Sequence, residues 1–149
     1  MTEAAANAVD VADVTAGPAW PLWCLDTHVY RIPLPAGWTV HASGGVEPAV
    51  FDLVGPHDSM IYVQVPQRVP PLDEMVADGQ QLVERGSFAA GDWVAVRYAH
   101  AGESYVQRHA VVNAKRVGAV VTLQCREHAL PLVAPTHEFV TNELRGGGE

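Results

Sequence analysis

The chain has 149 residues, of which 48% are hydrophobic and 17% are charged. This length and balance are typical of one folded domain that buries a core without disulfides, and they exclude a disordered tail. Lys and Arg number 9 against 17 Asp and Glu, so the formal net charge is -8. That charge argues against nucleic acid and anionic membrane surfaces as partners, because both bind through clustered basic side chains.

The start of the chain lacks the features of a secretion signal. Residues 1–20 carry acidic instead of basic side chains and contain no continuous apolar segment. No segment of the sequence approaches the ~18 consecutive apolar residues that a membrane-spanning helix needs. We therefore expect a cytoplasmic protein with no membrane insertion.

Composition divides the chain into three parts. Residues 1–19 are expected to be a mobile N-terminal arm, residues 20–145 a single domain, and residues 146–149 a flexible tail. The two cysteines, Cys24 and Cys125, are too few for a disulfide framework. Both fall in predicted strands, so buried thiols are the expected state and a single disulfide between them is the alternative.

The first part of the domain predicts four strands, because apolar, aromatic and β-branched residues cluster in segments that end near Pro or Gly. These segments are 22–32, 38–42, 50–54 and 59–65. In the last of them an aliphatic set alternates with a mixed one: Ile61, Val63 and Val65 against Met60, Tyr62 and Gln64. Such alternation is typical of an antiparallel sheet that is covered on one face only.

The apolar spacing then changes to a period near 3.6, which predicts a helix over residues 71–85. Its apolar side consists of Leu72, Met75, Val76, Leu82 and Val83. Pro71 suits the first turn of this helix, and Gly86 is expected to end it.

Three further strands are predicted at 92–100, 103–113 and 116–124, and the short turns between them make them antiparallel neighbours. Tight turns place two sets of side chains on opposite faces. The aliphatic face carries Val106, Ala110, Val112, Val117, Ala119, Val121 and Leu123, and the other face carries Tyr105, Gln107, His109, Thr122 and Gln124. A second helix is expected over residues 135–144, with Phe139, Val140 and Leu144 facing the sheet.

This order of elements predicts an α+β fold, a two-layer sandwich in which both helices pack on one face of an antiparallel β-sheet. The opposite sheet face then stays open.

Several segments resemble the fold shared by the Ran-binding Mog proteins and photosystem PsbP. They are the Leu34-Pro35-Ala36-Gly37-Trp38 turn after the first strand, the Ile61–Val65 strand, the helix expected from Leu72, and the strands through Tyr105–Val112 and Val120–Leu123. The resemblance covers about residues 25–145. It implies a non-catalytic adaptor or assembly role. One bacterial branch of similar length, the Eag-type chaperones of type VI secretion effectors, is cytosolic and often paired, and shelters apolar effector helices on the uncovered sheet face.

The residues indicate no metal, cofactor or catalytic centre. Among the seven histidines, the spacing of Cys125, His128 and His137 comes nearest to a zinc site, but a fourth ligand and a second close pair are missing. No serine lies in a Gly-x-Ser-x-Gly turn. Apolar strands also raise a thiol pKa, which makes the two cysteines poor nucleophiles. We therefore assign no catalytic residues and expect a protein that is not an enzyme.

The open sheet face is the candidate binding site, and its expected partner is a protein or a peptide. Aromatic rings supply contact area at low entropic cost, and amide or imidazole groups orient a ligand. The expected partner-binding residues are Tyr62, Gln64, Tyr98, Tyr105, Gln107 and His109. A homodimer that buries this face is one alternative. Another is a small enzyme or small-molecule-binding protein with His109 as general acid or base.

The histidines lead to a prediction about solubility. Protonation of all seven would change the formal charge from -8 to -1, and unperturbed histidines titrate near pH ~6.5. Loss of this self-repulsion should lower the solubility or the monomer fraction between neutral pH and about pH 5.5. Light scattering measures this, and a signal that stays constant across the interval would refute the idea.

Overall fold

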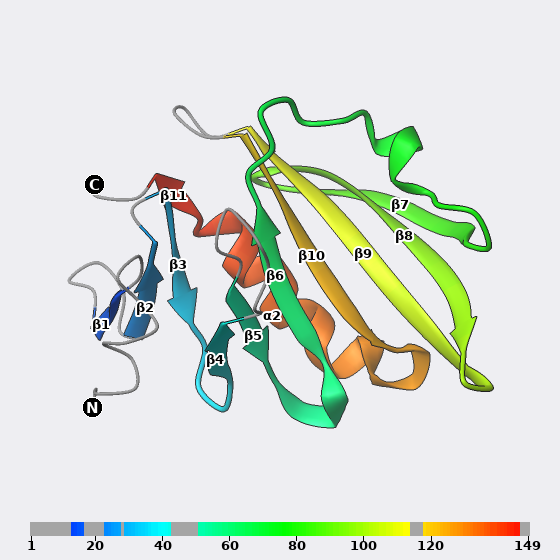
Figure 1. Ribbon diagram of the computed structural model, residues 1–149, viewed down its shortest axis with the longest axis horizontal. Coiled ribbons are helices and arrows are strands. Elements are labelled where there is room, and N and C mark those ends of the chain that lie inside the picture. The colour runs from blue at the N-terminus through cyan, green and yellow to red at the C-terminus, as the bar shows by residue number, and fades with distance from the viewer. Residues whose placement is uncertain (1–12, 17–22, 28, 43–50, 114–117, 147–149) are drawn as a thin grey trace.

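The computed structural model describes residues 13–16, 23–27, 29–42, 51–113 and 118–146 (Figure 1). Their strands form two antiparallel sheets. The smaller sheet has the order β1 (Asp13–Ala16), β2 (Trp23–Asp26), β3 (Tyr30–Leu34) and β11 (Arg145–Gly146). The larger sheet has the order β4 (Thr39–Ala42), β5 (Phe51–Val54), β6 (Met60–Gln64), β10 (Gly118–Arg126), β9 (Glu103–Asn113), β8 (Gly91–His100) and β7 (Gln81–Phe88).

The central strands confirm the side-chain faces expected for them, although β10 starts at Gly118, opposite Asn113, instead of at residue 116. Ala101 and Gly102 form the β8–β9 turn with positive φ angles of 53° and 79°, and His100 lies opposite Glu103. Two left-handed residues in a row match the twist of the flanking strands, which is why this turn closes in two residues. Val121 consequently lies opposite Ala110, on the aliphatic face of the larger sheet.

One α-helix, α2 (Leu130–Asn142), covers this aliphatic face in the described part of the chain, together with the preceding 3-10 turn η3 (Glu127–Ala129) (Figure 1). Its buried residues are Val133, His137, Val140 and Thr141. The α+β fold class is thus confirmed, with a helix layer on one sheet face. The helix starts five residues earlier than expected, so Pro135 lies inside it. Phe139 is 38% exposed instead of facing the sheet.

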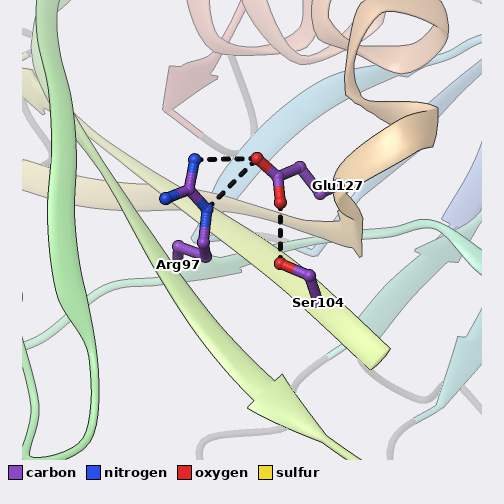
Figure 2. Close-up of polar contacts among 3 residues, drawn as sticks. All are labelled: Arg97, Ser104 and Glu127. Atoms are coloured by element: carbon purple, nitrogen blue, oxygen red, sulfur yellow. Dashed lines mark hydrogen bonds and ion pairs between the residues drawn. The ribbon is translucent and has the colours of Figure 1, made fainter. Parts of the chain in front are cut away.

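The carboxylate of Glu127 holds the η3 turn, which leads from β10 into α2, against the neighbouring strands. Figure 2 shows that both guanidinium contacts from Arg97 reach Glu127 Oε2, at 3.1 and 2.8 Å. The Ser104 hydroxyl donates to Glu127 Oε1 at 2.7 Å. The pKa of Glu127 is lowered by the Ser104 hydrogen bond and by Arg97. The turn between β10 and α2 is therefore tied to the hairpin of β8 and β9.

The helix predicted over residues 71–85 is wrong. Only the 3-10 turn η2 (Leu72–Met75) is helical there, and residues 81–88 form β7, which pairs with β8. Gly79 breaks the segment with a φ of +83°. Residues 81–88 gain backbone hydrogen bonds by pairing with β8. These bonds outweigh the weak helix preference that the apolar spacing indicated.

The segment 66–80, which we call the strap, runs over the sheet face opposite α2. Its η2 turn contacts β8 and β9, and Val69 lies against Gly118 of β10. Val94 and Val96, which point to this face, are both 0% exposed. The expectation that this face is uncovered is therefore wrong near β8, because the segment predicted as a helix on the aliphatic face crosses the other face instead.

The beginning of the domain also differs from expectation. The strand predicted over residues 22–32 is two strands, β2 and β3, separated by a turn in which the Thr27 hydroxyl accepts hydrogen bonds from the Val29 and Tyr30 amides at 3.3 and 3.1 Å. Residues 13–16 of the expected arm form β1, and Gly146 of the expected tail pairs with Tyr30. Residues 1–12 and 147–149 lie outside the described residues.

Cys24 and Cys125 are both buried thiols and are not joined by a disulfide. Trp38 is 7% exposed and belongs to the main core. No helix in the described part of the chain is long and apolar enough to cross a membrane.

A buried cation joins the sheet to α2. Arg108 of β9 is 8% exposed, and its guanidinium carbon lies 4.9 Å from the ring centroids of both Phe88 and Trp93. Its Nε donates to His137 Nδ1 and its Nη2 to the Ala134 carbonyl, each at 2.9 Å. His137 Nε2 lies 2.9 Å from the Val121 carbonyl, so this nitrogen carries the proton and donates it. Every partner of the guanidinium named here is neutral.

Burial, and then the nearby Arg108 charge, lower the pKa of His137 to about 3. In the unfolded chain this histidine titrates near pH ~6.5, so below that pH the unfolded state binds a proton that the folded state excludes. His137 therefore remains neutral in the range where the histidines were expected to reduce the net charge.

We predict that His137 makes the fold acid-sensitive. Its contribution lowers the free energy of unfolding by up to about 1.4 kcal/mol for each pH unit below ~6.5. Urea unfolding at several pH values between about pH 7 and pH 5 measures this slope, and the His137→Gln variant, which keeps a donor and an acceptor, should have a shallower one. Equal slopes in the two proteins would contradict the assignment.

Candidate functional site

The structure places all the sequence-predicted site residues on one face of the larger sheet, the face opposite α2, which we call the polar face. Cross-strand register decides this: Thr122 lies opposite both Tyr62 and His109, and Gln124 lies opposite Gln107. Tyr98 lies opposite Tyr105 on the β8–β9 hairpin. Gln64 lies at the end of β6 and is exposed, and the other five predicted residues are half-buried.

A row of polar side chains crosses five neighbouring strands of this face. The cross-strand pairs run from His41 of β4 through Asp52, Tyr62 and Thr122 to His109 of β9. His109 Nδ1 lies 2.8 Å from the Thr122 hydroxyl oxygen. At the exposed end, His41 Nε2 lies 2.9 Å from the Thr39 hydroxyl. Asp52, Tyr62, Thr122 and His109 each lie between two neighbouring strands, whereas His41 lies on the terminal strand β4.

Partial burial shifts the pKa values along this row in the directions that favour the neutral forms. Burial raises the pKa of Asp52, and nearby His41 offsets part of the rise. Burial also raises the pKa of Tyr62, which a hydrogen bond from Thr122 partly counteracts. Burial lowers the pKa of His109. Burial therefore shifts each of these three groups toward its neutral form.

A chain of amides forms the boundary between the row and the strap. Gln80 Nε2 of the strap donates to Gln107 Oε1 at 3.1 Å, and Gln107 Nε2 donates to Gln124 Oε1 at 2.9 Å. Gln80 Oε1 in turn accepts from the Ala77 amide at 2.9 Å. Gln107 is thereby held by two side chains. We therefore expect it to position its neighbours instead of binding a ligand directly.

The other end of the polar face is aromatic. The Tyr98 and Tyr105 rings stack with centroids 5.7 Å apart and planes 19° apart, and His100 meets Tyr105 edge-on at 5.9 Å. Arg126 hydrogen-bonds Tyr105, which raises the arginine pKa. Its Nε also lies 3.4 Å from Glu103 Oε1. These half-buried rings supply apolar contact area next to hydrogen-bonding groups.

The chemistry that this arrangement can perform is limited. Thr122 is the hydroxyl bonded to His109, and it is 0% exposed, so no substrate atom can approach its oxygen. Burial raises the pKa of Cys125 to about 11, which keeps this thiol protonated. Among the described residues, no group of three or more His, Cys, Asp or Glu side chains could hold a metal ion.

Sequence reasoning missed three members of this site: His41, Asp52 and Gln80. His41 and Asp52 lie in predicted strands, but only the β4–β5–β6 register brings them next to Tyr62. A count through a tight turn would not have found Asp52, because five residues that include the 3-10 turn η1 (Pro56–Asp58) connect β5 and β6. No local signal could have found Gln80, because it lies in the segment that was predicted as a helix.

The comparison with known proteins concerns the fold. No protein-family model and no curated protein matches the chain. The structure is similar to the solution structure of cyanobacterial PsbP (CyanoP) from Synechocystis sp. PCC 6803, with 11% identity over 93% of this chain and 94% of that chain and a TM-score of 0.48.

Two crystal structures are similar to a comparable degree. One is a protein from Bacteroides thetaiotaomicron VPI-5482, with 13% identity over 80% of this chain and 46% of that chain and a TM-score of 0.49. The other is LpqN, involved in cell envelope biogenesis of Mycobacterium tuberculosis, with 10% identity over 77% of this chain and 81% of that chain and a TM-score of 0.39. At these identities and TM-scores the similarities say nothing about function.

We predict that the Thr122 hydroxyl stabilises the fold through its buried bond to His109. Thr122→Val keeps the shape but leaves a buried acceptor or donor unpaired, which costs about 1–3 kcal/mol of unfolding free energy. The matched control is Thr39→Val, which removes an exposed threonine–histidine bond on the same sheet and should cost less than about 0.5 kcal/mol. Urea unfolding compares the two variants. Equal losses of unfolding free energy would contradict the prediction that the buried Thr122–His109 bond stabilises the fold.

Proposed function

We propose that this chain is a binding protein that holds a protein or peptide partner on its polar face and carries out no reaction on it. The observation that carries the proposal is the arrangement of Tyr62, Tyr98, Tyr105 and Gln124 around side chains that are already hydrogen-bonded to one another. Such a surface is ordered before a partner arrives, so little conformational entropy is lost on binding. Half-buried tyrosines beside amides are typical of protein interfaces.

The strap bounds the accessible part of this face. Opening it would expose Val94 and Val96, which are fully buried, at a cost of about 1.5–3 kcal/mol for each side chain. The strap therefore stays in place when the partner binds. The partner lies over the half of the polar face that contains the tyrosine stack and Gln64.

A finer proposal follows from the resemblance in sequence: the partner could be a secreted effector for which this chain acts as a cytoplasmic chaperone. The polar side chains on this face argue against a partner that makes only apolar contacts. A homodimer that uses the same face would satisfy the same chemistry. An enzyme or small-molecule-binding protein that uses His109 as acid or base has less support, because the hydroxyl that contacts this histidine, on Thr122, is fully buried and cannot reach a substrate.

The test begins with a photo-crosslinking amino acid placed at Gln64 in the full chain and expressed in the source cells. Leu132, which is 63% exposed on α2, is the matched control position on the other side of the sheet. A partner identified only from the Gln64 position is then purified for affinity measurement. Crosslinks of the same partner from both positions would contradict a site on the polar face.

With the purified partner, Tyr98→Ala should weaken binding about tenfold or more, as expected for a central aromatic contact. Phe139→Ala, an exposed aromatic ring on α2, should leave the affinity within about twofold. Melting temperatures of both variants separate lost binding from lost folding. Unchanged affinity of the Tyr98→Ala protein would refute the proposal, and a crosslink of the chain to itself would favour the homodimer.

A further inference from the structure

The outer edge of the larger sheet carries a second candidate interaction surface, separate from the polar-face site. β7 is the terminal strand, and in the described part of the chain no strand pairs with its outer side (Figure 1). Its side chains are mostly exposed. A strand with one unpaired side presents backbone N–H and C=O groups that an extended chain can bond.

A hollow of about 260 Å³ adjoins this edge, lined by Leu72 of η2, Arg85, Gly86 and Ser87 of β7, and Asp92 and Trp93 of β8. The Trp93 indole packs directly against the backbone of Gly86, where there is no room for a Cβ, and so forms the floor of the hollow. The hollow is smaller than the ~300–1,000 Å³ of small-molecule sites. Its size suits one side chain of a peptide that lies along β7.

Charges next to the edge define the peptide further. Glu84 lies opposite Ala95, on the α2 side of the sheet, whereas Arg85 lies opposite Val94 and pairs at 2.8 Å with Asp73 of the strap. Most of the residues that line the hollow belong to the strap or to strap-side positions of β7 and β8: Leu72, Arg85, Ser87 and Asp92. Because neighbouring residues of a strand point to opposite faces, a basic residue near Glu84 and an apolar residue in the hollow would occupy adjacent positions. The formal charge of -8 also favours a basic partner.

A second copy of this chain fits the edge poorly. Antiparallel two-fold pairing of β7 with itself must place residues of the same face opposite each other. The registers of greatest overlap centre on Glu84 or on Arg85, and so bring two Glu84 or two Arg85 side chains directly opposite each other. Like charges in that position are destabilising, and the register shift between Leu82 and Glu84 interrupts the pairing further.

We infer that β7 binds an extended peptide as an additional strand of the sheet, with a basic residue beside Glu84 and the adjacent apolar side chain in the hollow next to Leu72. This surface does not depend on the polar face, and either site can fail its test without affecting the other.

The test selects random phage-displayed dodecapeptides on the full-length protein and measures the bound complex by NMR hydrogen exchange. The selected peptides should share neighbouring basic and apolar residues and should slow the exchange of β7 amides. Selection of no peptide above background, or protection confined to other strands, would overturn the inference. Self-association through β7 in sedimentation experiments would overturn it as well.

Two charge reversals then locate the peptide. Glu84→Lys should weaken the selected peptide about tenfold through like-charge repulsion. Glu138→Lys on α2 is the matched control, because the Glu84 and Glu138 carboxylates both act electrostatically on buried Arg108, so the fold experiences similar changes. Equal affinities of the two variants would place the peptide elsewhere and contradict the inference.

Discussion

The buried guanidinium of Arg108 is the constraint on which the packing of the two layers depends. A cation removed from water costs several kcal/mol unless its donors are satisfied, and here the acceptors come from α2 while the flanking rings come from β7 and β8. The β7–β8 hairpin, strand β9 and helix α2 must therefore be in place together. Cation–π contact with two rings adds about 0.5–2 kcal/mol for each ring.

The same constraint determines the state of His137. To accept from Arg108 at Nδ1, the ring must be neutral and must carry its proton on Nε2, which faces the Val121 carbonyl. A protonated ring would place two cations in contact within the core. The pairing explains why a helix with two prolines and an exposed phenylalanine still docks in one position: polar bonds fix its location, and aliphatic contacts fill the space between them.

The two faces of the larger sheet have different roles. The aliphatic face provides stability through its helix layer. The polar face carries the cross-strand row from His41 to His109, in which burial favours the neutral forms of Asp52, Tyr62 and His109. The strap then covers the part of that face above Val94 and Val96. What remains accessible is the tyrosine stack and Gln64, with the ion pair of Arg126 and Glu103 beside Tyr105.

The alternation of residue types along each strand determined a good deal of this protein without any structure. The α+β class, the central hairpins and the common face of Tyr62, Tyr98, Tyr105, Gln107 and His109 follow from period-two patterns and short turns, because antiparallel register is local once a turn closes in two residues. The segment around Leu72 and Leu82 misled the prediction, since helical periodicity over a few residues cannot report a strand partner that lies farther along the chain. Only the tertiary structure decided that this segment crosses the polar face, that Arg108 is buried between rings, and that Asp52 joins His109 in one row. Each of these depends on residues distant in sequence meeting across strands or layers, and their energies arise only after the chain has folded.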